Sequence, residues 1–447
     1  MDPLDPLHPL SRRTLTVAAA GALASAAAVG TAQAATAART ATPARTADAA
    51  RTADPARPAG PAAAPGTSRR ELRGMWIATV ANTDWPSAPG LSPQAQRAEL
   101  TGLLDLAVER RLNAVMVQVR PTADAFWPSP YEPWSQYLTG TQGRDPGWDP
   151  LGTAVHEAHR RGLEVHAWFN PYRVAMTDDP GTLAPTHPAR LHPEWVLPYG
   201  GKLYYDPGQP QVRRFVEDAM LDAVRRYPVD AVHFDDYFYP YPVAGQTFAD
   251  DASYARYGAG FPDRDAWRRH NTDLLVREMA ARIKQVRPGT QYGISPFGVW
   301  RNAATDPLGS ATAAGVQTYD DLHADTRGWV ERGWLDYIAP QVYWLAQPLD
   351  QQVPANYAVL VPWWSDVVRG TGVDLYIGEA LYKVGDPAQP AQWQDPRELL
   401  RHLDLCAEHP EVRGNVYFSA KEVRADPLGA MTLIQDRYAR RGGQWAR

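Results

Sequence analysis

Asp235 and Asp236 form the most conspicuous pair of reactive side chains in this 447-residue sequence. They follow the apolar run 231–234, which is typical of a buried strand. Two adjacent carboxyl groups repel each other when both are ionised, so at least one pKa of the pair should be raised. A carboxyl with a raised pKa can act as a general acid, while a second carboxylate stabilises or attacks a cationic carbon. This is the chemistry of glycosidic bond hydrolysis. The alternative is that one Asp caps a helix or pairs with Arg173.

Two histidines lie within the predicted strands, His166 in the run 164–169 and His233 in the run 231–234. His166 and His233 each alternate with apolar neighbours, which predicts either an interior histidine bonded to a carbonyl or carboxylate, or a hydrogen-bond donor to a sugar hydroxyl. With Asp235 and Asp236 they could also bind a metal ion. The four residues lack a compact ligand spacing, so we expect no metal and no other cofactor.

Two arginines also follow apolar runs. Arg120 and Arg173 could bind a carboxylate such as the lactyl group of a muramic acid, or could hold Asp124 and Asp236 in position. The second interpretation is favoured for Arg173.

Aromatic residues supply the other candidates for sugar binding. The sequence has 16 Trp and 21 Tyr, whose flat apolar faces and polar edges suit sugar rings, although such rings also fill cores. Together with amide side chains at the ends of apolar runs, the candidates are Trp168, Asn170, Tyr237, Trp300, Gln341, Tyr343 and Trp344.

Strand-like and helix-like segments alternate along the chain, and this alternation predicts the fold that positions these residues. Eight short β-rich runs are separated by longer segments of helical period, which favours parallel strands with crossover helices. We therefore predict an α/β fold, a (β/α)8 TIM barrel with extended loops at its C-terminal face, over residues 69–447. A doubly wound sheet is the competitor, but no glycine-rich nucleotide motif follows the first run. The predicted strands are 74–80, 114–119, 164–169, 231–234, 292–295, 337–340, 374–377 and 414–418.

Glu379 follows the seventh of these runs and is the next candidate for an acid or a base. An acidic side chain at the centre of a barrel is tolerated only when it is catalytic or paired. The long segments 120–150, 170–205 and 236–264 follow strands and should build a cleft around such residues.

The composition restricts the class of partner. With 44% hydrophobic and 21% charged residues the chain is globular, and its net charge of −5 shows no basic face for nucleic acid or an anionic membrane. We expect a polysaccharide partner and a monomer. The single cysteine, Cys406, excludes an internal disulfide and fits the apolar side of a helix.

The N-terminal segment is typical of an exported protein. Arg12 and Arg13 precede the apolar stretch 17–29, and Ala32-Gln33-Ala34 is a cleavage pattern. This predicts a twin-arginine signal over 1–34, with an ordinary secretory signal as the alternative, and an extracellular or cell-wall location. The stretch is too short to span a bilayer, for which about 20 residues are needed, so we expect no stable membrane insertion. Residues 35–68, rich in Ala, Thr and Pro, should be a flexible linker.

Five motifs together resemble the glycosyl-hydrolase-like family 10 group. The similarity covers about residues 70–420 and implies a barrel, an envelope location and an amino-sugar polymer as substrate, because the family includes an enzyme that cuts peptidoglycan strands without stem peptides. The motifs are Arg73-Gly74-Met75-Trp76, Gln118-Val119-Arg120-Pro121, Phe169-Asn170-Pro171-Tyr172-Arg173, Phe234-Asp235-Asp236-Tyr237-Phe238-Tyr239-Pro240 and Pro340-Gln341-Val342-Tyr343-Trp344.

A second resemblance concerns mechanism. The runs 230–235 and 341–343 are similar to the fourth and sixth strands of chitinase-like barrels, in which the acetamido group of the substrate is the nucleophile. The acid glutamate of those proteins would fall at Tyr237, so this chain departs from their pattern. Asp235 or Asp236 would instead be the acid, or would orient the acetamide.

The sequence therefore predicts an exported glycoside hydrolase that cleaves cell-wall glycan strands of N-acetylated amino sugars. Two alternatives stay open: an α-glucan hydrolase with Asp235 as nucleophile and Glu379 as acid, and a glycan-binding barrel without catalytic activity.

Overall fold

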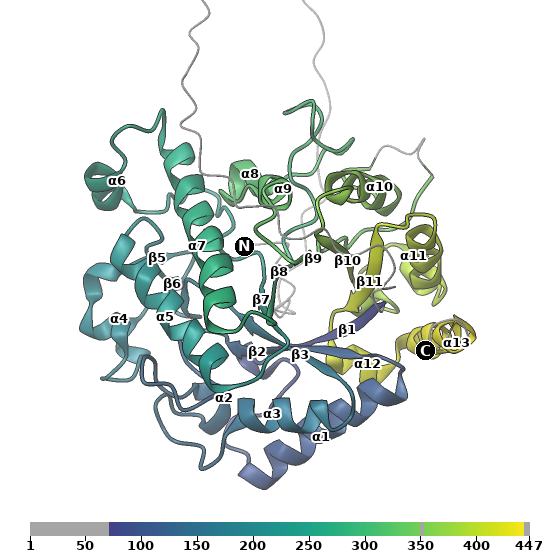
Figure 1. Cartoon of the computed structure of the whole chain (residues 1–447), viewed down its shortest axis with the longest axis horizontal. Helices are drawn as coiled ribbons and strands as arrows, with labels where there is room; N and C mark the ends of the chain where they lie inside the picture. The colour runs from purple at the N-terminus through teal and green to yellow at the C-terminus, as the bar shows by residue number, and fades with distance from the viewer. Residues whose placement is uncertain (1–70, 349–352, 442–447) are drawn as a thin grey trace, which may run out of the picture. The chain divides into compact units, whose positions relative to one another are not determined.

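Eight parallel strands close into a barrel in the computed structural model, which describes residues 71–348 and 353–441. Neighbouring strands follow the order β1-β11-β10-β9-β8-β7-β3-β2, and helices surround them (Figure 1). The predicted (β/α)8 barrel is confirmed. The strands are β1 (Leu72–Ile77), β2 (Ala114–Arg120), β3 (Glu164–Phe169), β7 (Ala231–Phe234), β8 (Gln291–Ile294), β9 (Tyr337–Ile338), β10 (Asp374–Glu379) and β11 (Val412–Tyr417).

Each of the eight predicted runs overlaps one barrel strand, and the differences lie at the ends. β9 stops at Ile338, whereas the prediction extended to residue 340. Pro340 has no backbone N–H to donate to a neighbouring strand, which favours the early end. The predicted signal 1–34 and linker 35–68 lie outside the described residues.

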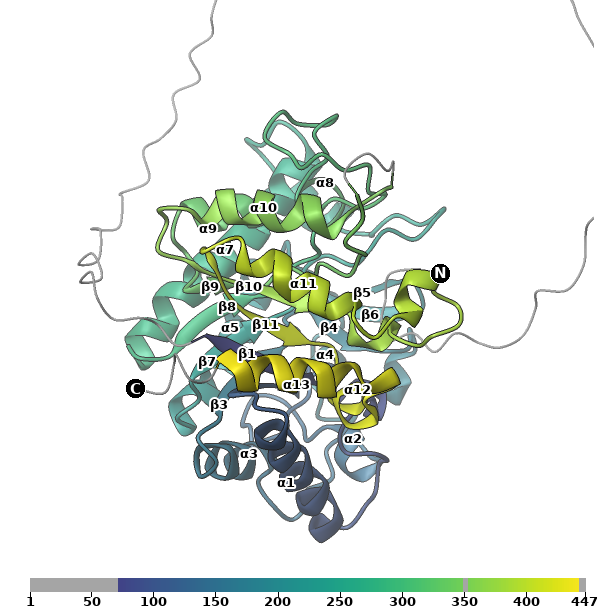
Figure 2. The same cartoon turned by 90° about the vertical axis from the view of Figure 1, so that its right-hand side faces the viewer.

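Helices form the outer layer because each buries one apolar face against the strands. Leu100, Leu103, Leu104 and Ala107 of the first helix are buried, whereas Val108 is 46% exposed. Figure 2 shows α10, α11, α13 and α1 following one another around the barrel. The helices are α1 (Pro93–Glu109), α2 (Gln136–Thr139), α3 (Pro150–His159), α4 (Pro188–Leu191), α5 (Pro210–Arg226), α6 (Asp251–Tyr257), α7 (Arg264–Val286), α8 (Thr318–Asp321), α9 (Thr326–Glu331), α10 (Tyr357–Val368), α11 (Glu398–Ala407), α12 (Ala420–Ala425) and α13 (Ala430–Arg441).

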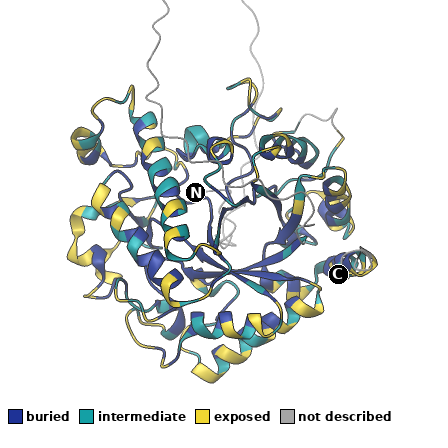
Figure 3. Cartoon of the chain, viewed as in Figure 1, coloured by how far each residue is buried: buried dark blue, intermediate teal, exposed yellow. Residues whose placement is uncertain are grey.

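Two apolar clusters form the core. The barrel strands between them are buried, as their dark blue colour in Figure 3 shows. One lies between strands and helices, where Cys406 is buried in α11 as predicted. The other fills the barrel itself and includes Trp76, Trp168, Tyr337 and Phe418. Across the described ranges, no helix combines the length and the apolar character that crossing a membrane requires.

The long connections after the strands carry additional structure. The segment after β3 contributes a three-stranded antiparallel sheet of β4 (Arg173–Ala175), β6 (Lys202–Tyr205) and β5 (Val196–Tyr199), which the sequence analysis did not predict. These connections follow the C-terminal strand ends, where (β/α)8 enzymes build their sites.

Candidate active site

A hollow with an empty volume of about 320 Å³ lies at the C-terminal ends of the strands. The lining combines two carboxyl groups with aromatic rings, and its members come from six of the barrel strands or the residues directly after them. They are Trp76, Trp168, Asp235, Asp236, Tyr237, Ser295, Gln341, Tyr343 and Phe418.

Asp235 is held on the side of β3. Trp168 Nε1 donates to Asp235 Oδ2 over 3.1 Å, and the amide Nδ2 of Asn170 donates to the same oxygen. The backbone N–H of Tyr237 donates to Asp235 Oδ1 over 3.2 Å. None of these N–H groups can accept a proton from the carboxyl, so the contacts favour its ionised form.

Burial and charge act on Asp235 in opposite directions. Burial has the larger effect, so the pKa of Asp235 is raised above its ordinary value, and the Arg173 guanidinium and the hydrogen-bond donors offset only part of this rise. Arg173 is itself buried, its Nε donates to the carbonyl of Pro121 over 3.0 Å, and its guanidinium lies 5.1 Å from the centre of the Tyr237 ring.

Asp236 lines the same hollow and accepts a hydrogen bond from the hydroxyl of Tyr241. Tyr241 also packs against the ring of Tyr237, with 5.6 Å between ring centres. The adjacent carboxyl groups thus have different environments: N–H donors and a nearby guanidinium for Asp235, and a tyrosine hydroxyl for Asp236.

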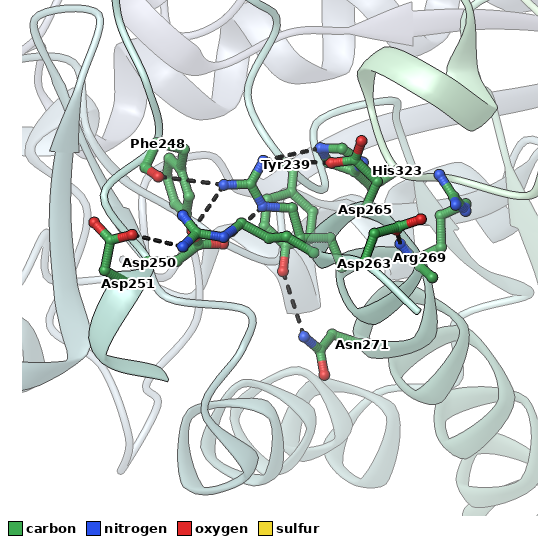
Figure 4. Close-up of polar contacts among 12 residues, drawn as sticks. Tyr239, Phe248, Asp250, Asp251, Asp263, Asp265, Arg269, Asn271 and His323 are labelled. Atoms are coloured by element: carbon green, nitrogen blue, oxygen red, sulfur yellow. Dashed lines mark hydrogen bonds and ion pairs between the residues drawn. The ribbon is translucent and has the colours of Figure 1, made fainter. Parts of the chain in front are cut away.

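Helix α7 fixes the segment that follows the two aspartates (Figure 4). Arg268 donates to both oxygens of Asp250 over 2.7 Å, and its guanidinium lies 5.6 Å from the ring centre of Tyr239. Asn271 lies 3.5 Å from the Tyr239 hydroxyl. The loop 236–264 is therefore anchored to a helix at both Tyr239 and Asp250, which limits movement of the nearby carboxyl groups.

Six of the predicted site residues meet at the hollow. These are Asp235, Asp236, Trp168, Tyr237, Gln341 and Tyr343. Trp76, Ser295 and Phe418 complete the lining and were not among the predicted site residues. Trp76 belongs to the motif Arg73-Gly74-Met75-Trp76, and alternation along β1 places it on the same face as the interior residue Leu72.

The predicted role of His166 and His233 in binding sugar is not supported, because neither lines the hollow. Both side chains are fully buried in the barrel interior and contact the hydroxyl of Tyr337 over 2.9 Å. The interpretation as interior histidines is the one that matches the structure.

Asn170 and Arg173 lie behind the hollow rather than in its lining. Asn170 accepts from Gln118 over 2.7 Å while it donates to Asp235. Contact with a sugar was the predicted role of Asn170, but its geometry fits support of Asp235. For Arg173, support of a carboxyl group was the favoured interpretation, and its charge lowers the pKa of Asp235.

Arg120 does not face the hollow. It forms a fully buried ion pair with Glu132, with Nε donating over 2.7 Å and Nη2 over 2.5 Å. Nη1 donates to the carbonyls of Asn170 and Pro171. Its guanidinium is therefore fully engaged by Glu132 and by two backbone carbonyls. This corrects the prediction of a sugar-binding arginine.

Asp124 is also fully buried outside the lining, where it accepts from Gln142 Nε2 over 3.3 Å. Burial raises the pKa of Asp124 to about 7 from its ordinary 3.8. Between pH 3.8 and about pH 7, Asp124 is therefore protonated in the folded chain but ionised in the unfolded chain. The free energy of unfolding falls as pH rises through this range, because the buried carboxyl must ionise in the folded chain.

Asp124→Asn should accordingly be more stable than the unmodified chain at about pH 8, with the difference vanishing near about pH 4. Chemical denaturation at both pH values measures this. An equal difference in free energy of unfolding at both would contradict the raised pKa.

Glu379 is the clearest correction. It faces the helix layer, where Oε1 accepts from Tyr357 and Asn415 over 2.7 Å and Oε2 lies 2.8 Å from His402 Nδ1. Tyr357 and His402 belong to α10 and α11. Both carboxylate oxygens are engaged on the outside of the barrel, so this position does not support an acid or base role.

Trp300 and Trp344 do not line the hollow either. Trp300 is buried, donates to Asp325 over 3.1 Å and stacks on Trp363 at 6.2 Å. Trp344 is partly exposed and packs edge-on against Phe297 at 5.3 Å. The stacking role predicted for Trp300 is replaced by a packing role.

In the part of the chain that the structure describes, no three His, Cys, Asp or Glu side chains are grouped to hold a metal ion.

A (β/α)8 barrel with paired carboxyl groups among aromatic rings at its C-terminal face defines a barrel of the glycoside hydrolase class. The chain belongs to the family Glycosyl hydrolase-like 10, which residues 71–395 match. This confirms the family resemblance seen in the sequence.

Curated relatives agree with this assignment, and a solved structure shares the fold. The chain is 50% identical to glycosyl hydrolase YngK of Bacillus subtilis over 84% of its length and 74% of that protein. It is 42% identical to glycosyl hydrolase DigH of Escherichia coli over 83% of its length and 88% of that protein. Its fold is similar to the PgaB (BpsB) glycoside hydrolase domain from Bordetella bronchiseptica, with a TM-score of 0.51, 13% identity and coverage of 82% and 98%. Glycan hydrolysis is the activity class that the family supports.

Proposed function

We propose that this chain is an exported glycoside hydrolase that cleaves cell-wall glycan strands of N-acetylated amino sugars, with peptidoglycan lacking stem peptides as its substrate. The observation that carries the proposal is the presence of two differently held carboxyl groups, Asp235 and Asp236, in one hollow lined by aromatic rings.

The two aspartates would divide the chemistry. Asp236 would protonate the leaving glycosidic oxygen as the general acid. Asp235 accepts hydrogen bonds from Trp168 and Asn170, which partly offset the rise of its pKa on burial, and its carboxylate would stabilise positive charge at the anomeric carbon or orient the acetamido group of the sugar. The arrangement suits hydrolysis because it provides one proton donor and one fixed negative charge.

The aromatic lining would hold the sugar ring. The rings of Trp76, Tyr343 and Phe418 line the hollow with the amide of Gln341. Gln341 Nε2 donates to the carbonyl of Ser295 over 2.9 Å, which fixes the amide and directs its oxygen away from that contact. Apolar ring faces beside a fixed amide fit a sugar with apolar C–H faces and polar substituents.

Location and assembly are part of the proposal. The arginine pair and apolar stretch in residues 1–34 support export by the twin-arginine route to the cell wall or the exterior, and we propose a monomer.

The test is product release from purified peptidoglycan with and without stem peptides, with an α-glucan as a third substrate. The proposal expects soluble amino-sugar saccharides from the preparation without stem peptides. Release of neutral sugars from the glucan alone would favour an α-glucan hydrolase. Sedimentation with wall material without any product would favour a glycan-binding barrel.

Glu379→Gln separates the proposal from the α-glucan alternative, which uses Glu379 as the acid. We expect kcat to stay close to that of the unmodified chain, because Glu379 faces α10 and α11. Its contacts with Tyr357, His402 and Asn415 are weakened, so the free energy of unfolding should fall by about 1–3 kcal/mol. Kinetics and denaturation of the same sample measure both. A large loss of kcat with unchanged stability would contradict the assignment.

A further inference from the structure

A continuous chain of hydrogen bonds runs through the barrel interior beneath the hollow. It links Trp76, Ser295, His233, Tyr337 and His166, and it is called the file below. His233 Nε2 lies 3.1 Å from Trp76 Nε1 and 2.9 Å from Ser295 Oγ, two groups whose residues line the hollow. On its other side His233 Nδ1 lies 2.9 Å from the Tyr337 hydroxyl. That hydroxyl lies 2.9 Å from His166 Nδ1. The file thus joins the floor of the hollow to β3 and β9.

The chemistry of these groups fixes the direction of each bond. An indole N–H can only donate, so Nε2 of His233 must be the acceptor for Trp76. A neutral imidazole then carries its hydrogen on Nδ1 and donates it to the Tyr337 oxygen. The Tyr337 hydroxyl is left to donate to His166 Nδ1. One tautomer of His233 satisfies the whole file.

The surroundings support a neutral His233. The side chains of His166, His233 and Tyr337 are fully buried. Burial lowers the pKa of His233 well below its ordinary value, and His166 adds to this effect. A charged His233 would carry hydrogen on both nitrogens and would meet the indole N–H of Trp76 with a second donor.

The strand sequence makes room for the central tyrosine. A Cβ atom at Gly293 of β8 would lie 2.1 Å from the Tyr337 ring, so only glycine leaves space for the ring to lie inside the barrel. The ring is 6.0 Å from that of His233 and 5.3 Å from that of His166. The position of the hydroxyl is therefore determined by packing from neighbouring strands.

We propose that His233 is a positioning residue of the hollow, held by Tyr337 and His166 in the neutral tautomer whose Nε2 accepts from Trp76, with the Ser295 hydroxyl 2.9 Å from the same nitrogen. The positions of Trp76 and Ser295, which line the hollow, then depend on the hydroxyl of Tyr337, which lies outside the lining. The effect of this file on catalysis rests on the proposed function, whereas the tautomer does not.

The first experiment measures the tautomer directly. NMR of the chain labelled with ¹⁵N in the histidine rings should show His233 neutral at about pH 7, with hydrogen on Nδ1 and none on Nε2. His233→Gln and Trp76→Phe assign the ring and indole signals by their loss. Hydrogen on Nε2 of His233, or a charged His233 ring, in the unmodified chain would overturn the proposal.

A matched pair of tyrosine variants tests the coupling. Tyr337→Phe should shift the Trp76 indole signal and remove the single tautomer of His233. Tyr292→Phe is the control, because Tyr292 is equally buried on β8 and its hydroxyl has no hydrogen-bond partner within the described ranges. Identical Trp76 signals in Tyr337→Phe and the unmodified chain would overturn the coupling.

The catalytic readout comes second. With peptidoglycan lacking stem peptides as substrate, Tyr337→Phe should lower kcat/KM about tenfold or more, because small displacements of positioning groups have large effects on rate. Tyr292→Phe should retain the activity of the unmodified chain. Equal activity in both variants would overturn the positioning role, whereas a chain inactive on every glycan would contradict the proposed function and leave the tautomer result standing.

Discussion

Replacement of Asp236 by Asn is expected to lower kcat for glycan cleavage by about 10²–10⁴-fold, the usual contribution of a general acid. The amide keeps the size of the side chain in the hollow and its contact with Tyr241, but it has no proton to transfer to the leaving oxygen. Product release from peptidoglycan without stem peptides measures the loss. KM should change much less than kcat, because the aromatic lining is intact.

Two further variants make this result interpretable. Asp235→Asn should also lower kcat strongly, by removing the negative charge held by Trp168 and Asn170. Asp273→Asn is the matched control, because Asp273 of α7 likewise accepts an indole N–H, from Trp329 over 2.6 Å, outside the hollow. An Asp236→Asn variant as active as Asp273→Asn would remove Asp236 from the mechanism.

The second large effect concerns stability. Glu132→Gln should lower the free energy of unfolding by about 3–5 kcal/mol, because it leaves the guanidinium of Arg120 buried without a counter-charge. Both side chains are fully buried, and their two hydrogen bonds measure 2.7 and 2.5 Å. Chemical denaturation measures the loss.

An ion pair that is partly open to solvent provides the comparison. Glu157→Gln removes a contact of 2.7 Å with Arg161 on the surface, which solvent screens, so its effect should be small. Replacement of both Arg120 and Glu132 by apolar residues should recover part of the stability lost in Glu132→Gln, since no unpaired charge remains buried. Equal effects of Glu132→Gln and Glu157→Gln would contradict this account.

The fold followed from local sequence pattern. Runs such as 164–169 and 231–234 match strands β3 and β7 at both ends, because their β-branched and aromatic residues are bounded by turn residues on each side. The general position of the site followed as well. Asp235 and Gln341 come directly after or near strand ends, which a closed parallel barrel brings to one face.

The errors have a common physical cause. Glu379 and Arg120 are polar residues at strand ends, the feature that correctly selected Asp235, yet their partners come from distant segments. Alternation along β10 would have placed Glu379 on the side opposite to Tyr376, which lies in the barrel interior. For Trp300 the sequence contains no comparable signal, because its partners Asp325 and Trp363 lie 25 or more residues away.

The sequence by itself determined the barrel, the family and the acidic pair, because strand periodicity, helix faces and adjacent motifs are local properties of the chain. The tertiary structure alone decided which polar side chains face the hollow and which are paired elsewhere. It also brought Trp76, His233 and Tyr337 from three strands, and Ser295 from the end of a fourth, into one hydrogen-bonded file. Such contacts depend on barrel closure and on the space left at Gly293, and these are set by packing between segments far apart in the chain.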